Sequence, residues 1–351
     1  MTQLRLTDLS KEFSDQVAVR AVNLSIEAAE FIVLLGPSGC GKTTTLRMIS
    51  GLETPSAGAI LFDGEDMTSV PVQHRHVGLV SQRFNLFPHM RVYDNVAFGL
   101  SVRGIPASKI KAQVHDMLEA VQLSEYADRF PSQLSGGQMQ RVAIARTLVT
   151  CPKVLLLDEP FASLDTSLRT EMRSFLKQLQ RDMGMTTVLV THDQVEAMDL
   201  ADRIAVMFDG ELAQLGTPQQ VYHHPKSERV ARFMGHSNIF ECTVLAEEKI
   251  ETPFGPLDAS TNGAAAGRSR AMVRYEAIEL VEPSDHSSAQ CQINRLSGTV
   301  EAVEFLGAVT RCAVQVGAHR LVMDQPSTSV LEVGQPVNLQ IHRDHIGVLS
   351  R

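Results

Sequence analysis

The feature that most constrains the fold of this chain is a glycine-rich loop at residues 36–43. The loop reads GPSGCGKT, the apolar run FIVLL precedes it at residues 31–35, and the helix-permissive segment TTLRMIS follows it. A short apolar strand, a glycine turn and a helix in this order are typical of a parallel α/β sheet. Glycines let the backbone N–H groups of such a loop turn towards phosphate oxygens. The stretch therefore predicts an α/β fold with a nucleoside triphosphate site.

Each position of this loop has an expected role. Lys42 is expected to reach the outer phosphates, and the hydroxyl of Thr43 is expected to bind Mg²⁺. The remaining nucleotide contacts are predicted from the loop and the first helical turn: Gly36, Pro37, Ser38, Gly39, Cys40, Gly41 and Thr44. The alternative interpretation is a glycine-rich turn in an unrelated strand–helix junction.

The pattern of apolar and turn-forming residues changes near residue 236. Over residues 1–235, strand-like runs alternate with longer amphipathic segments, which predicts an α/β domain with a largely parallel sheet. The expected buried strands are residues 31–35, 77–80, 154–157, 187–190 and 203–207. From 236 to 351, Gly, Pro, Ser and Asn separate short alternating stretches, and we expect a small β domain there.

Composition and charge limit the class of protein. With 351 residues, 44% of them hydrophobic, the chain is long enough for two globular domains. Its apolar runs fall far short of the roughly 18 residues of a membrane helix, and its first residues lack the pattern of an export signal, so we expect a cytoplasmic protein. Five cysteines at unrelated spacings indicate neither a disulfide framework nor a zinc site. A net charge of −8 argues against nucleic-acid binding.

Two adjacent carboxylates follow the apolar run at residues 154–157. Parallel sheets bind their ligands at the carboxyl ends of the strands, which is where these side chains would lie. We assign Asp158 to Mg²⁺, through water, and Glu159 to polarising the attacking water. A turn that merely caps the strand is the alternative, but the phosphate loop upstream favours the catalytic interpretation.

A histidine follows the next apolar run, in the sequence Thr191-His192-Asp193. We predict that His192 senses the γ-phosphate and is not the catalytic base, although a lone histidine is more often structural. Asp193 and Glu196 are expected to form a capping box for the following helix.

Two further candidates depend more heavily on context. Gln82 comes just after the run at residues 77–80 and can reach Mg²⁺ or the attacking water, while starting a mobile loop. Phe13 is a candidate flat surface for the adenine ring, although an isolated aromatic residue more often belongs to a core.

The segment Leu134-Ser135-Gly136-Gly137-Gln138 precedes an amphipathic stretch at residues 138–147. The N-terminus of that helix would be a second anion site besides the one at the phosphate loop. One nucleotide can use both sites only if they face each other, which predicts that two copies of the chain close over it.

Taken together, these motifs resemble the ATP-binding subunits of ABC transporters. GPSGCGKT, Gln82, LSGGQ, LLLDEP, ASLD at residues 162–165 and THD occur in that family's order and approximate spacing. The tail, with NIF at 238–240, VRYE at 273–276 and EFLG at 304–307, is similar to the TOBE or OB-like domain of bacterial importers. The chain departs from the family pattern at Ser81, where phenylalanine is common, and at Tyr275, where proline is usual.

The resemblance implies a P-loop ATPase domain over residues 1–235, with a helical subdomain at about residues 85–150, and a regulatory β domain over 236–351. It further implies an antiparallel homodimer that binds ATP and Mg²⁺. In that dimer, Asp165 would couple the two sites, and the nucleotide held by Lys42 of one subunit would be capped by these residues of the other: Ser135, Gly136, Gly137 and Gln138.

The family also implies partners. The chain would be the ATP-hydrolysing, peripheral subunit on the cytoplasmic face of the inner membrane, working with integral permease subunits and, indirectly, a solute-binding protein. Residues 85–99 would form the groove for a permease helix, although their apolar side chains could equally be core. Residues 75–77 and 233–238 resemble polyamine-type importers most closely, with iron(III), sulfate, sugar and phosphonate importers as alternatives.

Two alternatives to this interpretation stay open. A soluble ATP-dependent switch is the contrasting class, but the acidic chain has neither a second cassette nor a coiled-coil insertion. The tail either binds a regulator or the transported solute, or only stabilises the dimer.

Overall fold

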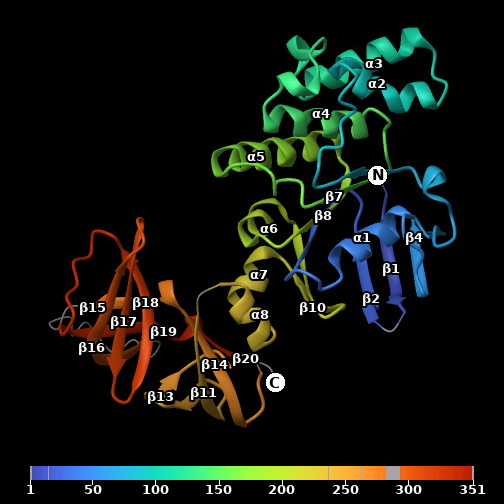
Figure 1. Cartoon of the computed structure of the whole chain (residues 1–351). Helices are drawn as coiled ribbons and strands as arrows, with labels where there is room; N and C mark the ends of the chain where they lie inside the picture. Colours follow the sequence, from blue (N-terminus) through green and yellow to red (C-terminus); the bar gives the residue numbers. More distant parts are fainter. Residues whose placement is uncertain (1, 15, 236, 262, 282–292, 350–351) are drawn as a thin grey trace. The chain divides into compact units, whose positions relative to one another are not determined.

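The computed structural model describes residues 2–14, 16–235, 237–261, 263–281 and 293–349. The chain forms two compact units, Met1–Pro218 and Gln219–Arg351, which are described separately below (Figure 1). The domain boundary predicted at residue 236 falls on a residue outside the described ones and stays a prediction.

The first unit is built on a six-stranded sheet with the order β10-β9-β3-β8-β7-β6. All neighbouring strands are parallel except β10 and β9, which are antiparallel. The five strands predicted from apolar runs are confirmed, and β7, β8 and β9 are slightly longer than predicted. The bounds are β3 (Phe31–Leu35), β6 (Val77–Val80), β7 (Val154–Asp158), β8 (Thr186–Thr191), β9 (Arg203–Phe208) and β10 (Glu211–Gly216).

A second, antiparallel sheet in this unit has the order β2-β1-β4-β5. Its strands are β1 (Leu4–Phe13), β2 (Gln16–Ile26), β4 (Ala57–Phe62) and β5 (Glu65–Asp66). Both sheets and helix α1 (Lys42–Ser50) contribute to one apolar core, in which Leu4, Ile32 and Leu46 are fully buried. Burial of such side chains stabilises by about 1.5–3 kcal/mol each, so the helix after the phosphate loop is fixed between the two sheets.

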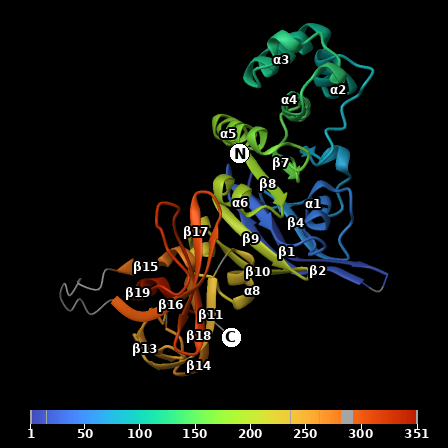
Figure 2. The ribbon, with the colours of Figure 1, turned by 60° about the vertical axis from the view of Figure 1, so that its left-hand side comes forward.

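Three helices form a separate layer of the first unit: α2 (Val92–Val102), α3 (Ala107–Ala120) and α4 (Gly136–Leu148). Helix α2 packs on both α3 and α4 (Figure 2). In α3, Ile110, Val114 and Leu118 recur at helical spacing and are buried, as an amphipathic helix requires. The unit also contains short 3₁₀ helices at Val72–His74, Ser124–Tyr126 and Pro131–Gln133. Helices α5 (Thr166–Met183) and α6 (Gln194–Leu200) complete it.

The second unit contains two five-stranded antiparallel sheets, in the orders β13-β12-β11-β14-β20 and β15-β19-β16-β17-β18. They share one core, in which Val273, Cys312 and Leu339 are fully buried. The sheet bounds are β11 (Ser237–Ala246), β12 (Lys249–Thr252), β13 (Gly255–Asp258), β14 (Gly267–Arg274), β15 (Ile278–Val281), β16 (Ile293–Phe305), β17 (Val309–Val316), β18 (His319–Pro326), β19 (Pro336–His342) and β20 (Ile346–Leu349).

Helical turns accompany these sheets. They are α7 (Pro218–His223), α8 (Glu228–Phe233), and 3₁₀ turns at Tyr275–Ala277 and Arg343–His345. Within the described ranges, none of the helices combines the length and apolar character needed to cross a bilayer.

Arg75 is a buried cation that completes the end of α1. Its side chain is 3% exposed, and its guanidinium donates to the carbonyl oxygens of Met48 at 2.7 Å and Ile49 at 3.0 Å. Two further bonds go to the carbonyls of Val70 and Thr68. Helix ends leave carbonyls without intrahelical partners. Here the guanidinium donates to two carbonyls of the last turn, of which that of Met48 also accepts from the N–H of Gly51. Arg75 therefore has a structural role. From the sequence, residues 75–77 are notable only for their resemblance to polyamine-type importers.

We expect Arg75→Met to lower the free energy of unfolding by about 3 kcal/mol, because four backbone carbonyls lose the guanidinium as a donor and two of these hydrogen bonds are buried. Thermal and urea denaturation of the full chain measures this. Arg103→Met is the matched control, since the side chain of Arg103 is exposed and, among the described residues, forms one hydrogen bond, to the carbonyl of Thr150. Equal unfolding midpoints for the two variants would contradict the structural role of Arg75.

Candidate active site

The backbone of the phosphate loop passes too close to its neighbours to carry side chains at two positions. A Cβ on Gly36 would lie 2.3 Å from the carbonyl oxygen of Met207, and one on Gly41 would lie 2.5 Å from that of Ala18. Gly41 also has φ = 100°, a left-handed conformation that favours glycine. The loop therefore packs tightly against β9 and β2, and it delivers α1 with its N-terminus at the carboxyl end of β3.

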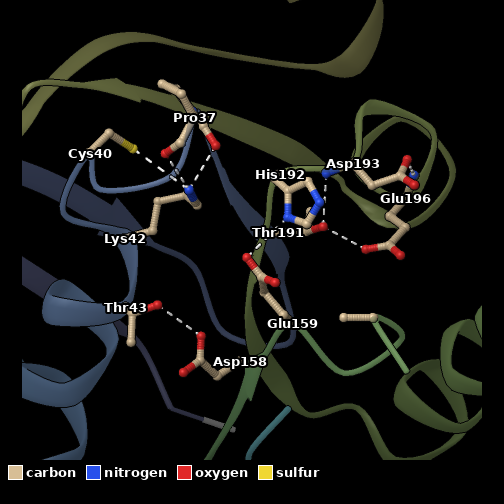
Figure 3. A network of polar contacts seen from close by, with 12 residues as sticks. Pro37, Cys40, Lys42, Thr43, Asp158, Glu159, Thr191, His192, Asp193 and Glu196 are labelled. Atoms are coloured by element: carbon tan, nitrogen blue, oxygen red, sulfur yellow. Dashed lines mark hydrogen bonds and ion pairs between the residues drawn. The ribbon is translucent and has the colours of Figure 1, made fainter. Parts of the chain in front are cut away.

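Lys42 is the first residue of α1, and its side chain bends back across the loop. It is 5% exposed, and Nζ donates to the carbonyl oxygens of Gly36 at 2.7 Å and Pro37 at 2.8 Å (Figure 3). Cys40 Sγ lies 3.7 Å from the same nitrogen. Burial raises the pKa of the Cys40 thiol, despite the opposing effect of Lys42. The ammonium group is thus already held inside the loop, where phosphate oxygens would replace the carbonyls.

Thr43 and Asp158 meet although 115 residues separate them. The Thr43 hydroxyl donates to Asp158 Oδ1 at 3.0 Å. Asp158 ends β7, and burial raises its pKa; the hydrogen bond from Thr43 acts against this, and Glu159 adds to it. Two oxygen donors at the edge of a buried strand suit a hard cation such as Mg²⁺.

Glu159 and His192, each the residue directly after a strand, face each other across neighbouring strand ends. Glu159 Oε1 lies 3.1 Å from His192 Nδ1, and β7 and β8 are adjacent in the sheet (Figure 3). Glu159 has φ = 46°, an uncommon value for a side-chain-bearing residue, and its N–H donates to the carbonyl of Val190. Backbone strain of this kind costs on the order of 1–3 kcal/mol and is concentrated at functional sites.

The turn after β8 differs in one respect from the prediction. Asp193 caps α6, accepting from the N–H groups of Val195 at 2.7 Å and Glu196 at 3.2 Å. Glu196 does not complete a capping box; its carboxylate accepts a 2.6 Å bond from the hydroxyl of Thr191. Thr191 also accepts from the N–H of Asp193. Burial raises the pKa of Glu196, and the bond to Thr191 opposes this. The Glu196 carboxylate thus binds the buried hydroxyl of Thr191 in place of the backbone N–H that a capping box would use.

The segment at residues 135–138 opens α4 with a capping box. Ser135 Oγ accepts from the N–H of Gln138 at 3.3 Å, and Gln138 Oε1 accepts from the N–H of Ser135 at 3.0 Å. A Cβ on Gly137 would lie 2.6 Å from Leu168 Cδ1, and one on Gly136 would lie 3.2 Å from Leu164 Cδ2. The two glycines thus allow α5 and the turn before it to pack on the start of α4.

The remaining predicted residues are placed as follows. Asp165 caps α5, accepting from the N–H of Leu168 at 3.0 Å. Phe13 ends β1 with 45% of its surface exposed, and it therefore does not belong to the core; Lys11 Nζ lies 4.8 Å from its ring centroid. Gln82 is exposed just beyond β6, and no hydrogen bond joins it to another described residue.

The structure therefore brings together one group of the predicted residues. Lys42, Thr43, Asp158, Glu159 and His192 gather at the carboxyl ends of β3, β7 and β8 (Figure 3). Among the described residues, no hydrogen bond or ion pair joins this group to Phe13, Gln82, Ser135 or Asp165.

Sequence reasoning missed Thr191 as the buried residue that positions the turn carrying His192. The sequence contained a signal for this role. The hydroxyl of a threonine at the end of a buried strand needs a hydrogen-bond partner, and Glu196 lies close by in the chain, in the first turn of the next helix.

Comparison with known proteins defines the class of this site. The ABC transporter family model matches residues 19–162, and the TOBE domain model matches residues 271–349. A solved structure of CbiO1 from Clostridium perfringens, described as part of the ABC transporter complex CbiONQ, is 33% identical with a TM-score of 0.59. It covers 62% of this chain and 89% of its own.

Sequence relatives extend the match over most of the chain. The spermidine/putrescine import ATP-binding protein PotA of Aliivibrio fischeri is 47% identical over 80% of this chain and 77% of its own length. The protein of the same name from Clostridioides difficile is 39% identical over 99% of this chain and 98% of its own. That from Vibrio parahaemolyticus is 52% identical over 69% of this chain and 64% of its own.

The chain thus belongs to the ATP-binding subunits of ABC importers, the family that its motifs resemble. Its fold of a P-loop ATPase domain followed by a TOBE domain is confirmed, as is ATP hydrolysis as its activity.

We expect Asp158→Asn to raise the melting temperature of the nucleotide-free chain by about 2 °C. The raised pKa means that the folded state disfavours the ionised carboxylate, so stability falls as the pH rises from the unfolded to the folded pKa. At neutral pH, the neutral amide avoids that penalty and can still accept from Thr43.

Differential scanning calorimetry at pH 7 measures the change. Asp165→Asn is the control, because asparagine caps a helix as well as aspartate does and should leave the melting temperature unchanged. A lower melting temperature for Asp158→Asn would contradict the assignment of a desolvated carboxylate.

Proposed function

We propose that this chain is the ATP-hydrolysing subunit of a polyamine importer, acting as a homodimer beneath separate permease subunits. The observation that carries the choice of cargo is the near full-length match to a spermidine/putrescine import ATP-binding protein, which spans 98% of that relative. The alternatives are importers of iron(III), sulfate, sugars or phosphonates. The site described above supports the hydrolytic part of the proposal.

ATP binding begins at the phosphate loop. The backbone N–H groups of residues 38–44 and the N-terminus of α1 supply partial positive charge to the phosphates. Lys42 exchanges its bonds to the carbonyls of Gly36 and Pro37 for phosphate oxygens, so little rearrangement is needed. Phe13 offers an exposed ring on which adenine can stack.

Thr43, Asp158 and Gln82 are the residues proposed to hold Mg²⁺, Asp158 through water. The fit rests on the chemistry of the donors, which are a hydroxyl and a carboxylate 3.0 Å apart and the amide of Gln82. Gln82 follows β6, the strand paired with β7, and has no other partner among the described residues. When bound, the ion neutralises charge on the phosphates. Its arrival would also remove the penalty for ionising Asp158.

Glu159 is the proposed catalytic base. Its carboxylate lies at the strand edge, where it can accept a proton from the attacking water, and the 3.1 Å contact with His192 fixes its orientation. His192 then has its other ring nitrogen available for the γ-phosphate. The task of these groups is mainly to position the water and to stabilise charge, because phosphoryl transfer requires little covalent chemistry from the protein.

The homodimer is proposed because the site in one chain is incomplete. The capped N-terminus of α4 at Ser135 is a second place for phosphate oxygens, and among the described residues no hydrogen bond joins it to the Lys42 group. In an antiparallel pair, residues 135–138 of one copy would complete the site of the other. Asp165, at the start of the helix packed on Gly137, would meet the dimer interface at the same time.

The proposed partners are integral permease subunits and a solute-binding protein, with the chain peripheral on the cytoplasmic face of the inner membrane. Phe87 and Phe98 support the docking of a permease helix, because their rings pack 4.6 Å apart and Phe98 is 38% exposed. An apolar pair at the surface of the helical layer offers a site for an apolar helix face.

We expect Glu159→Gln to retain ATP binding but to lower the rate of hydrolysis on the order of 10²-fold or more, because the amide cannot accept the proton. Nucleotide binding, phosphate release and size-exclusion chromatography with ATP measure this, and the last should show a trapped dimer. Glu171→Gln, on the exposed side of α5, is the control and should hydrolyse normally. Normal hydrolysis by Glu159→Gln would show that Glu159 is not the catalytic base.

The cargo is tested by uptake. In cells lacking this gene, radiolabelled putrescine or spermidine uptake should fall at least tenfold, on the order of the loss expected when the driving ATPase is absent, and the native chain but not Glu159→Gln should restore it. Uptake of iron(III), sulfate, maltose and a phosphonate serves as the comparison. A selective loss of one of these with intact polyamine uptake would replace the proposed cargo and leave the ATPase assignment in place.

A further inference from the structure

The segment that follows β6 has almost no regular structure, although it contains Gln82. Residues 81–91 form no helix or strand. One backbone–backbone hydrogen bond joins two of them, from the N–H of Met90 to the carbonyl of Phe87, and the carbonyl of Arg91 accepts from the N–H of Asn95 in α2. The conformation of such a segment depends on side chains that satisfy its backbone groups. Three side chains do so here: Ser81, Asn95 and Arg146.

Arg146 lies in the last turn of α4 and contacts the segment at three places. Nη1 donates to the carbonyl of Asn85 at 2.7 Å and Nη2 to that of Phe84 at 3.1 Å. Its guanidinium carbon lies 5.4 Å from the ring centroid of Phe87. Among the described residues no carboxylate pairs with it. The partly buried cation is therefore committed to this segment alone.

Ser81, the first residue of the segment, holds its first part in a turn through two side-chain hydrogen bonds. Its hydroxyl donates to the carbonyl of Arg83 at 2.8 Å and accepts from Asn85 Nδ2 at 2.7 Å. Asn85 has φ = 48°, a left-handed conformation that asparagine tolerates better than most residues. Gln82 thus lies in a small turn held by Ser81, at the position where this chain departs from the family pattern.

Asn95 holds the second part on α2. Its side chain accepts from the N–H of Phe87 at 2.8 Å and donates to the carbonyls of Phe87, Met90 and Arg91. The two halves of the segment are thereby attached to different helices, and Arg146 is the residue that connects the Gln82 half to α4.

Helix α4 begins at Gly136, beside the capping Ser135, and continues to Leu148. Its 13 residues span about 20 Å, so a displacement at Ser135 is carried to Arg146 by a rigid element. We propose that Arg146 is a positioning residue that makes the Gln82 turn move with the start of α4. This inference rests on the proposed function. In that function Gln82 serves the nucleotide of its own chain and the start of α4 caps the nucleotide of the partner, and Arg146 would couple the movements of the two.

The chemistry explains why arginine is needed. The planar guanidinium places two N–H donors on two carbonyls at once and lays its face on Phe87, whereas a lysine ammonium is a point charge without that fork. Arg146→Lys should therefore keep the positive charge but loosen the turn, and Arg146→Gln should loosen it further.

Tryptic cleavage after Arg83 tests this directly, because Arg83 is exposed and lies inside the turn. We expect Arg146→Lys to accelerate cleavage of the 83–84 bond in the full chain about tenfold, as loss of one charge-assisted hydrogen bond implies. Cleavage after Arg91, at the start of α2, should be unchanged. Mass spectrometry of the fragments gives both rates. Arg103→Lys is the control, because the Arg103 guanidinium donates to the carbonyl of Thr150 and not to the 81–91 segment.

Steady-state kinetics with MgATP supplies a readout that a merely structural role would not move. We expect Arg146→Lys to lower kcat about tenfold while KM for ATP stays within about twofold, because the Lys42 site is untouched. Arg103→Lys should keep native values of both constants.

The two proposals fail separately, because the cleavage assay needs no ATP turnover. If the native chain does not hydrolyse ATP, the proposed function fails and the cleavage result still stands. If both Arg146 variants keep native cleavage after Arg83, the positioning role is refuted. If the Arg146 variants do not fold, as shown by loss of their melting transition, Ser81→Ala is tested instead, because this substitution leaves α4 intact. Faster cleavage of Ser81→Ala after Arg83 would support a turn held by side chains. Cleavage at the native rate would overturn the proposal.

Discussion

The structure depends on one close approach, that of the phosphate loop to the strands beside it. At Gly36 and Gly41 the loop backbone leaves no room for a Cβ, since the carbonyl oxygens of Met207 and Ala18 would lie within 2.5 Å of it. This packing fixes where α1 begins and hence where Lys42 and Thr43 point. The parallel order of β3, β8 and β7 then places the carboxyl ends of the strands at one edge, so Asp158 and His192 reach the same region without any local sequence relation to the loop.

Much of this arrangement was accessible from the sequence, because the strands are short, apolar and bounded by turn formers. The five buried runs, the helix after the loop and the all-β tail follow from patterning that tertiary packing reinforces. What could not be predicted is the choice among competing polar partners. Glu196 had a local capping role available and instead accepts from Thr191, a choice decided by burial and not by spacing. Likewise, nothing in the sequence indicates that Arg75 and Arg146 bind backbone carbonyls 20 or more residues away.

Two kinds of arginine therefore have to be distinguished in this chain. Arg203 and Arg311 form ion pairs with Glu30 and Asp324, as charged residues usually do. Arg75 and Arg146 instead complete irregular backbone, where their forked donors substitute for secondary structure. Resemblance to a family locates the motifs but does not reveal these supporting contacts, which depend on how loops and helix ends are satisfied in three dimensions.

The contact between Gly137 and Leu168 has a consequence for assembly. It packs the first turn of α4 directly on the first turn of α5, whose cap is Asp165. Ser135 and Asp165 therefore belong to one preformed surface and are not two independently mobile motifs. In the proposed homodimer, a second subunit that docks there would order few additional side chains, so the entropic cost of association would be small.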